Sequence, residues 1–71
     1  MKKFQYTARW ANPGQGSLAN VSFEASSDNR ASLRADKIAR DLHLIHSPRT
    51  IQCWKNGKHI IVEELKSARK T

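Results

Sequence analysis

Residues 50–65 read TIQCWKNGKHIIVEEL and carry the clearest structural signal in this 71-residue chain. Thr50–Lys55 and Lys58–Leu65 are two β-prone runs that are separated by the dipeptide Asn56-Gly57. Asn and Gly both accept the positive φ angles of a type I′ turn, so this arrangement predicts a β-hairpin. The turn also predicts the cross-strand pairs, which are Lys55 with Lys58, Trp54 with His59, Cys53 with Ile60, and Ile51 with Val62.

A second hairpin is predicted near the beginning of the sequence. Apolar and polar residues alternate from Phe4 to Trp10 and again from Ala19 to Ala25. A period of two is typical of half-buried strands. The segment 12–17 between them, Asn-Pro-Gly-Gln-Gly-Ser, is dense in turn formers and predicts a mobile loop.

Between the two hairpins, from about Asp28 to Leu44, the hydrophobic period becomes helical. The polar run 26–29, Ser-Ser-Asp-Asn, supplies several candidate N-caps for this helix. Its apolar face is predicted to contain Ala31, Ala35, Ile38 and Leu42. The expected fold class is therefore α+β, with the order ββαββ and one helix packed on one face of an antiparallel sheet of about four strands. Residues 1–65 would form a single compact domain, and 66–71 a basic, flexible tail containing Lys66, Arg69 and Lys70.

Because one helix covers one face of such a sheet, the strand residues divide into two sets. The set predicted to face the helix is Phe4, Tyr6, Val21, Phe23, Ile51, Cys53, Ile60 and Val62. The set predicted to face solvent is Lys3, Gln5, Thr7, Arg9, Asn20, Ser22, Gln52, Trp54, His59 and Ile61. An exposed aromatic residue among cations is typical of surfaces that bind single-stranded nucleic acid. Alternatively, Trp54 and Ile61 pack against each other or become buried in a dimer.

The charge balance of the chain indicates an anionic partner. Thirteen Lys and Arg residues outnumber six Asp and Glu residues, which gives a formal net charge of +7 and a pI of about 10.2. Such an excess attracts polyanions, of which nucleic acids are the commonest in cells. On the predicted helix, a cationic stripe is formed by Arg30, Arg34 and Lys37, with Arg40 on its flank.

This stripe has three interpretations: a phosphate-binding surface, a solvated helix face, or a contact with a protein. Asp36 and Asp41 interrupt it and are predicted to pair locally with Lys37 or Arg40. Leu33 and Leu44 lie away from the predicted apolar face, which favours the protein contact.

The sequence offers no arrangement of nucleophile, base and acid, so we expect no enzymatic activity and no cofactor. His43 and His46 lack nearby Cys or acidic ligands, so we expect no metal site. Cys53 is expected to be a buried, unreactive thiol, and a single cysteine fits a reducing compartment. No apolar run approaches the roughly 20 residues of a membrane span, so we expect a soluble, cytoplasmic protein without a membrane partner.

Residues 22–62 also resemble a known group of proteins. The similarity lies in Glu24-Ala25-Ser26, a helix with Ala35 and Ile38-Ala39-Arg40, Thr50-Ile51, and the hairpin at Asn56-Gly57-Lys58. This pattern resembles small phage- and prophage-encoded proteins with one helix on an antiparallel sheet, including some anti-CRISPR proteins. Some of those are basic inhibitors that attach to a bacterial surveillance complex and obstruct its target-DNA path. The resemblance implies a phage or mobile-element origin and a protein partner that itself handles nucleic acid.

Two function hypotheses follow. In the first, the chain is a non-catalytic protein of bacterial or phage origin that binds DNA or RNA. Its predicted site residues are Lys3, Arg9, Lys55 and Lys58 on the phosphate backbone and Trp54, which stacks on bases or wedges between them. The helix residues Arg30, Arg34 and Lys37 assist, and His59 is a further predicted contact with the nucleic acid. In the second, it is an inhibitor that docks on an acidic or nucleic-acid-handling protein. A homodimer through the exposed sheet face or an edge strand is compatible with both.

Overall fold

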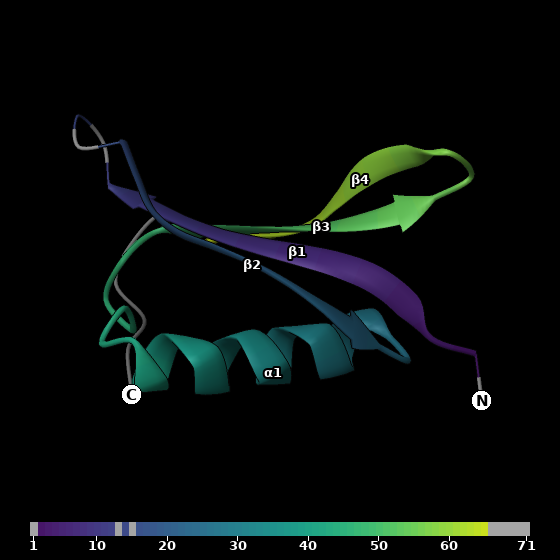
Figure 1. The fold of residues 1–71 in the computed structure, drawn as a ribbon, viewed down its shortest axis with the longest axis horizontal. Helices are drawn as coiled ribbons and strands as arrows, with labels where there is room; N and C mark the ends of the chain where they lie inside the picture. Colours follow the sequence, from purple (N-terminus) through teal and green to yellow (C-terminus); the bar gives the residue numbers. More distant parts are fainter. Residues whose placement is uncertain (1, 13, 15, 66–71) are drawn as a thin grey trace.

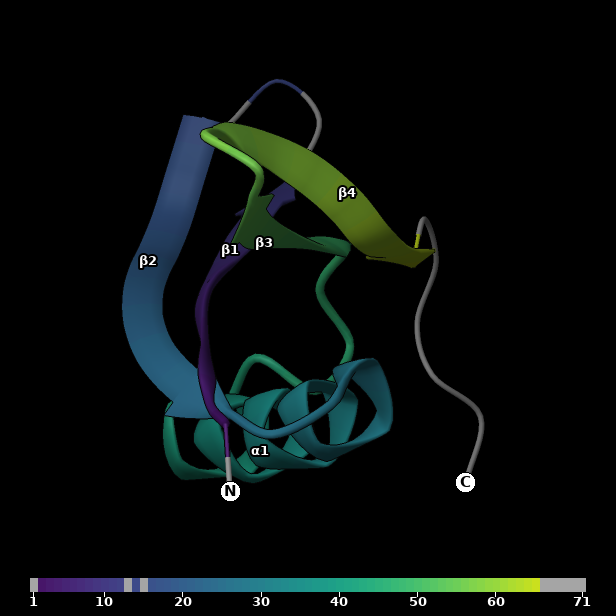
Figure 2. The same cartoon turned by 90° about the vertical axis from the view of Figure 1, so that its right-hand side faces the viewer.

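The elements follow the predicted ββαββ order. A computed structural model describes residues 2–12, 14 and 16–65, so the predicted tail at 66–71 lies outside the described residues. The elements are β1 (Phe4–Asn12), β2 (Gly16–Ala25), α1 (Asp28–Asp41), β3 (Arg49–Lys55) and β4 (Lys58–Leu65). The four strands form one antiparallel sheet in the order β2-β1-β3-β4, with α1 below it (Figure 1 and Figure 2). The predicted α+β fold is confirmed.

The β3–β4 hairpin has the predicted turn but a different register beyond it. Asn56 and Gly57 adopt φ angles of 51° and 76°, as a type I′ turn requires. The pairs from Lys55–Lys58 to Cys53–Ile60 are also confirmed. The predicted pair Ile51–Val62 is wrong, because a bulge between Ile51 and Gln52 places Ile51 opposite Glu63. An extra residue on one strand shifts every later pair by one position.

The bulged hairpin bends away from the helix, as Figure 1 shows at the β3–β4 turn. Ile60, which was predicted to face the helix, is therefore 37% exposed. Its cross-strand partner Cys53 is fully buried, as predicted. Val62 is partly buried and packs against the core despite its changed register.

The β1–β2 hairpin is longer than the alternation predicted. Its strands pair as far as Asn12 and Gly16, and the register shifts after Trp10. Leu18 has no partner in this register and is 41% exposed. Pro13 and Gln15 lie outside the described residues, and so does the prediction of a mobile loop that included them.

Helix α1 begins as predicted but ends at Asp41 rather than near Leu44. Ser27 is the N-cap, and its Oγ accepts a hydrogen bond from the backbone N–H of Arg30 at 3.2 Å. After the helix, His43 takes a left-handed φ of 58° and reverses the chain direction. This turn leaves Leu42 48% exposed and packs Leu44 against the core, so both predictions for these leucines are wrong.

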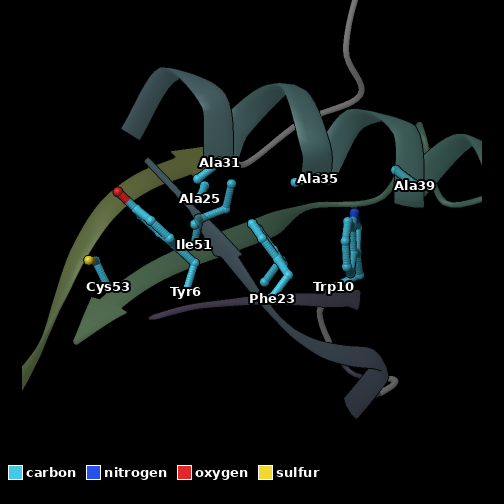
Figure 3. Packing of buried hydrophobic residues seen from close by; sticks show 10 residues of the cluster. Tyr6, Trp10, Phe23, Ala25, Ala31, Ala35, Ala39, Ile51 and Cys53 are labelled. Carbon is cyan, nitrogen blue, oxygen red and sulfur yellow. The ribbon is translucent and has the colours of Figure 1, made fainter. Parts of the chain in front are cut away.

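The core lies between the helix and one face of the sheet (Figure 3). Ala31, Ala35 and Ala39 form the buried stripe of the helix, and their small side chains let it pack closely on the strands. The largest buried side chains from the sheet are Trp10 and Tyr6. The predicted helix-facing set omitted three buried apolar strand residues that share this face, namely Ala8, Trp10 and Ala25.

Candidate nucleic-acid interface

A buried guanidinium joins strand β3 to strand β4 and to the helix. Arg49 is 5% exposed, and its Nε donates a hydrogen bond to Oε1 of Glu63 at 2.7 Å. Its Nη1 donates to Oδ1 of Asp36 at 2.6 Å, and its Nη2 donates to Oγ of Ser32 at 3.2 Å. The hydroxyl of Ser32 in turn donates to Oε2 of Glu63 at 2.6 Å. The contact of Asp36 with Arg49 spans distant parts of the sequence, and the local prediction for Asp36 missed it.

A second polar cluster lies at the start of the helix. The hydroxyl of Tyr6 donates to Oδ1 of Asp28 at 2.6 Å, and Nζ of Lys55 lies 3.6 Å from the same oxygen. The pKa of Tyr6 is raised above its ordinary value. Burial of the phenol is the larger cause, and its hydrogen bond to Asp28 is the second. The Nζ atom of Lys55 also lies 5.7 Å from the ring centroid of Phe4. Asp28 thus supplies an anion beside the like charges of Lys55 and Lys58, which face each other across the turn.

These two clusters change the balance of surface charge. Asp28, Asp36 and Glu63 are three of the six acidic residues in the chain, and each of them forms an ion pair with Arg49 or Lys55. Most other Lys and Arg side chains in the described part of the chain are exposed. Outside these two clusters, exposed Lys and Arg side chains outnumber exposed Asp and Glu side chains in the described part of the chain, which leaves a cationic excess.

That excess is concentrated in one groove between α1 and the end of β2, which we call the cationic groove. It has a volume of about 490 Å³ and is lined by Lys3, Glu24, Ala25, Ser26, Arg30, Leu33, Arg34 and Lys37. Three of its cations share a helix face because they are spaced by four and three residues along α1. Lys3, predicted to act on the exposed sheet face, instead joins these helix cations at the residue before β1 begins.

No helix of the described residues covers the opposite face of the sheet, and we call it the open sheet face. Trp54 is 50% exposed there, and the ring of His59 meets it edge-on with centroids 4.7 Å apart. Ile61, which is 56% exposed, pairs with Gln52 rather than with Trp54. The structure thus brings Trp54 and His59 together as the hairpin register predicted.

A small polar hollow, the Arg9 pocket, lies on the same face. It has a volume of about 200 Å³ and is lined by Thr7, Arg9, Asn20, Thr50 and Gln52. The strand register explains this grouping, because Arg9 of β1 pairs with Asn20 on one side and Thr50 on the other. Sequence patterning placed four of the lining residues on the exposed face but gave no sign that they converge on one hollow.

The predicted site residues therefore fall into separate places. Lys3, Arg30, Arg34 and Lys37 share the cationic groove. Arg9, Trp54 and His59 share the open sheet face, whereas Lys55 binds Asp28 and Lys58 is exposed beside the hairpin turn. The nine residues do not form one continuous cluster around Trp54.

No group of three or more His, Cys, Asp or Glu side chains in the described part of the chain is arranged to hold a metal ion. No helix among residues 2–65, as far as they are described, has the length and apolar character needed to cross a membrane. Comparisons with protein-family models, curated proteins and solved structures found no match to this chain.

Proposed function

We propose that this protein is a non-catalytic nucleic-acid-binding module whose cationic groove holds the phosphate backbone. The observation that carries the proposal is the convergence of Lys3, Arg30, Arg34 and Lys37 on one groove whose lining holds one carboxylate, Glu24. Lys3 lies far from the helix cations in sequence, so the spacing within the helix does not account for the cluster. Four cations close together would cost stability through repulsion, and a polyanion relieves that cost.

Counterion release predicts how strongly such binding responds to salt. Each phosphate neutralised contributes about −0.9 to the slope of log K against log salt for duplex DNA. Four contacts therefore predict a loss of roughly 100-fold in affinity between 50 and 200 mM salt. Binding of this kind carries little sequence specificity, because phosphate contacts position a protein without reading bases.

The test is the fluorescence anisotropy of labelled DNA and RNA oligonucleotides, single-stranded and duplex, at several salt concentrations. The double variant Arg30→Gln/Arg34→Gln should weaken binding to all of them and make the salt slope shallower by about two contacts. The matched control is Arg40→Gln/Lys58→Gln, which removes the same charge from exposed positions outside the groove. The proposal is wrong if the native chain binds none of the oligonucleotides at 50 mM salt, or if the control weakens binding as much as the groove variant.

A second function, docking on an acidic protein that handles nucleic acid, is favoured by Leu33. This side chain is 64% exposed and lies among the groove cations. A large apolar residue within a charged surface is typical of protein interfaces, whereas phosphate contacts gain nothing from it. Capture of one specific protein from nuclease-treated bacterial lysate, lost in Leu33→Asp and kept in Leu42→Asp, would support this function over the first.

A further inference from the structure

The Arg9 pocket has the chemistry of a site for one small polar group. Its lining combines a guanidinium, two amide side chains and two hydroxyls, and no carboxylate is among the lining residues. These groups supply donors in excess together with several acceptors. At about 200 Å³ the pocket is smaller than the 300–1,000 Å³ typical of sites for drug-sized molecules. It therefore suits a single planar group with polar edges rather than a whole metabolite.

An aromatic platform lies beside this pocket. Gln52 lines the pocket, and Trp54 follows two residues later on the same face of β3, which places their Cα atoms roughly 7 Å apart. Half of the Trp54 side chain is exposed although His59 contacts its ring. Stacking on an exposed indole and hydrogen bonding along the edge of a base are the two contacts that unpaired nucleobases make with proteins.

The breadth of the sheet excludes a duplex from this site. Thr7 and Arg9 belong to β1, which has a neighbouring strand on each side. Four strands at a spacing of about 4.8 Å span about 14 Å between the outer strand axes. The major groove of B-DNA is about 12 Å wide, so it does not admit the whole sheet face down to its central strand. An unpaired base can unstack from its neighbours and enter the pocket, so the width of the sheet does not prevent its binding.

We propose that the open sheet face binds the unpaired bases of a single strand, with one base stacked on Trp54 and the edge of a neighbouring base in the Arg9 pocket. This inference rests on the proposed nucleic-acid binding and adds that the preferred nucleic acid is single-stranded. The cationic groove supplies affinity for any phosphate backbone, and the open sheet face supplies the preference for single strands. Arg9, Asn20 and Gln52 form the hydrogen bonds to the edge of the base, and these bonds contribute to the preference for single strands.

The experiment compares one labelled 12-nucleotide strand with its own duplex, in DNA and in RNA, at a single salt concentration. The native chain should prefer the single strand. Trp54→Ala should weaken single-strand binding by about 5- to 100-fold, the usual loss of one stacked base, and leave duplex binding unchanged. Gln52→Ala and Asn20→Ala should reduce the same preference, because they remove contacts to the base edge.

Arg9→Lys separates shape from charge, because lysine keeps the positive charge but lacks the planar fork of five donors. It should lower the preference for single strands and leave the salt slope unaltered. Gln5→Ala, at an exposed β1 residue outside the pocket, is the control and should change nothing.

Four outcomes would overturn the proposal, and they can be told apart. Equal affinity for strand and duplex in the native chain, with the groove variants still defective, refutes the open-face site and leaves the proposed function intact. Loss of affinity for strand and duplex alike in Trp54→Ala and Gln52→Ala does the same. Light scattering that shows a dimer abolished by Trp54→Ala identifies the open sheet face as a self-association surface instead. Absence of any binding to nucleic acid refutes the proposed function as well.

Discussion

Arg49 of β3 and Asp36 of α1 lie 2.6 Å apart in an ion pair whose cationic side chain is 4% exposed. The pair joins the helix to the sheet at the end where the core contains Trp10 (Figure 3), whose register partner on β3 is Arg49 itself. Glu63 and Ser32 complete the hydrogen bonds of the guanidinium, which compensates the cost of removing a charge from water.

Replacing this guanidinium should destabilise the fold strongly. Arg49→Met leaves Asp36 and Glu63 near each other without the cation that both of them contact. Loss of one partner from a buried ion pair costs about 3 kcal/mol in the free energy of unfolding, which urea denaturation measures. Arg49→Met combined with Asp36→Leu and Glu63→Leu should recover most of that loss, because no unpaired charge remains. A triple variant no more stable than Arg49→Met would contradict this explanation.

The hydrogen bond from Tyr6 to Asp28 should make stability decline in alkaline solution. Below pH 10 the phenol is protonated in both the folded and the unfolded chain, so the contact contributes its full stabilisation. Above pH 10 the unfolded chain loses the proton, whereas burial and Asp28 raise the pKa of Tyr6 in the folded chain and keep it protonated. The stabilisation is therefore lost at about 1.4 kcal/mol per pH unit as the pH rises above 10.

Tyr6→Phe isolates this effect from the titration of lysines. The variant should be less stable than the native chain by about 1.5 to 3 kcal/mol at pH 8, the usual contribution of a hydrogen bond to a charged group. The difference should shrink between pH 10 and pH 11 in urea denaturation. A constant difference over this range would show that the phenol titrates normally in the folded chain.

The close approach of helix and sheet depends on the alanine stripe. Ala35 is fully buried, so Ala35→Leu should cost about 1 to 3 kcal/mol through overpacking. Leu33, two residues earlier, is 64% exposed, so Leu33→Ala should change the free energy of unfolding by less than about 0.5 kcal/mol. Thermal denaturation of both variants checks the prediction. Equal losses of stability in the two variants would contradict the assignment of Ala35 to the buried face of the helix and of Leu33 to its exposed face.

The two tryptophans should differ in their access to solvent. Trp10 is completely buried and Trp54 is 50% exposed, so iodide should quench part of the fluorescence and leave the rest. Trp54→Phe should remove the quenchable part, and its remaining emission should lie at a shorter wavelength. Full protection of both indoles in the native chain would indicate that Trp54 is covered by a second molecule.

Much of the fold could be predicted because its signals are local. Asn56-Gly57 set the hairpin turn and three of the four predicted cross-strand pairs, and Ser27 was among the candidate N-caps. The bulge after Ile51 could not be predicted from the alternation, because an inserted residue shifts the register without altering the residue types. For the same reason Glu63 was not recognised as the partner of Ile51. The exposure of Ile60 was missed because it follows from the bend of the hairpin and not from its pairing, which is as predicted.

The candidate site was predicted only in its parts. The spacing of Arg30, Arg34 and Lys37 on the helix was visible in the sequence, but the arrival of Lys3 in the same groove was not. The convergence of polar side chains around Arg9 depends on the pairing of three strands, which no single segment encodes.

The sequence by itself determined the order of elements, the two hairpins and the excess of positive charge, because turn chemistry, periodicity and composition act over a few residues. Only the tertiary structure decided where that charge lies. Asp36 and Glu63 come from different elements and meet at Arg49, and Asp28 meets Lys55. None of these three carboxylates lines the groove, where four cations accompany the single carboxylate of Glu24. Electrostatic attraction depends on distance in space, so the position of the cationic surface was fixed by the folded chain rather than by the order of its residues.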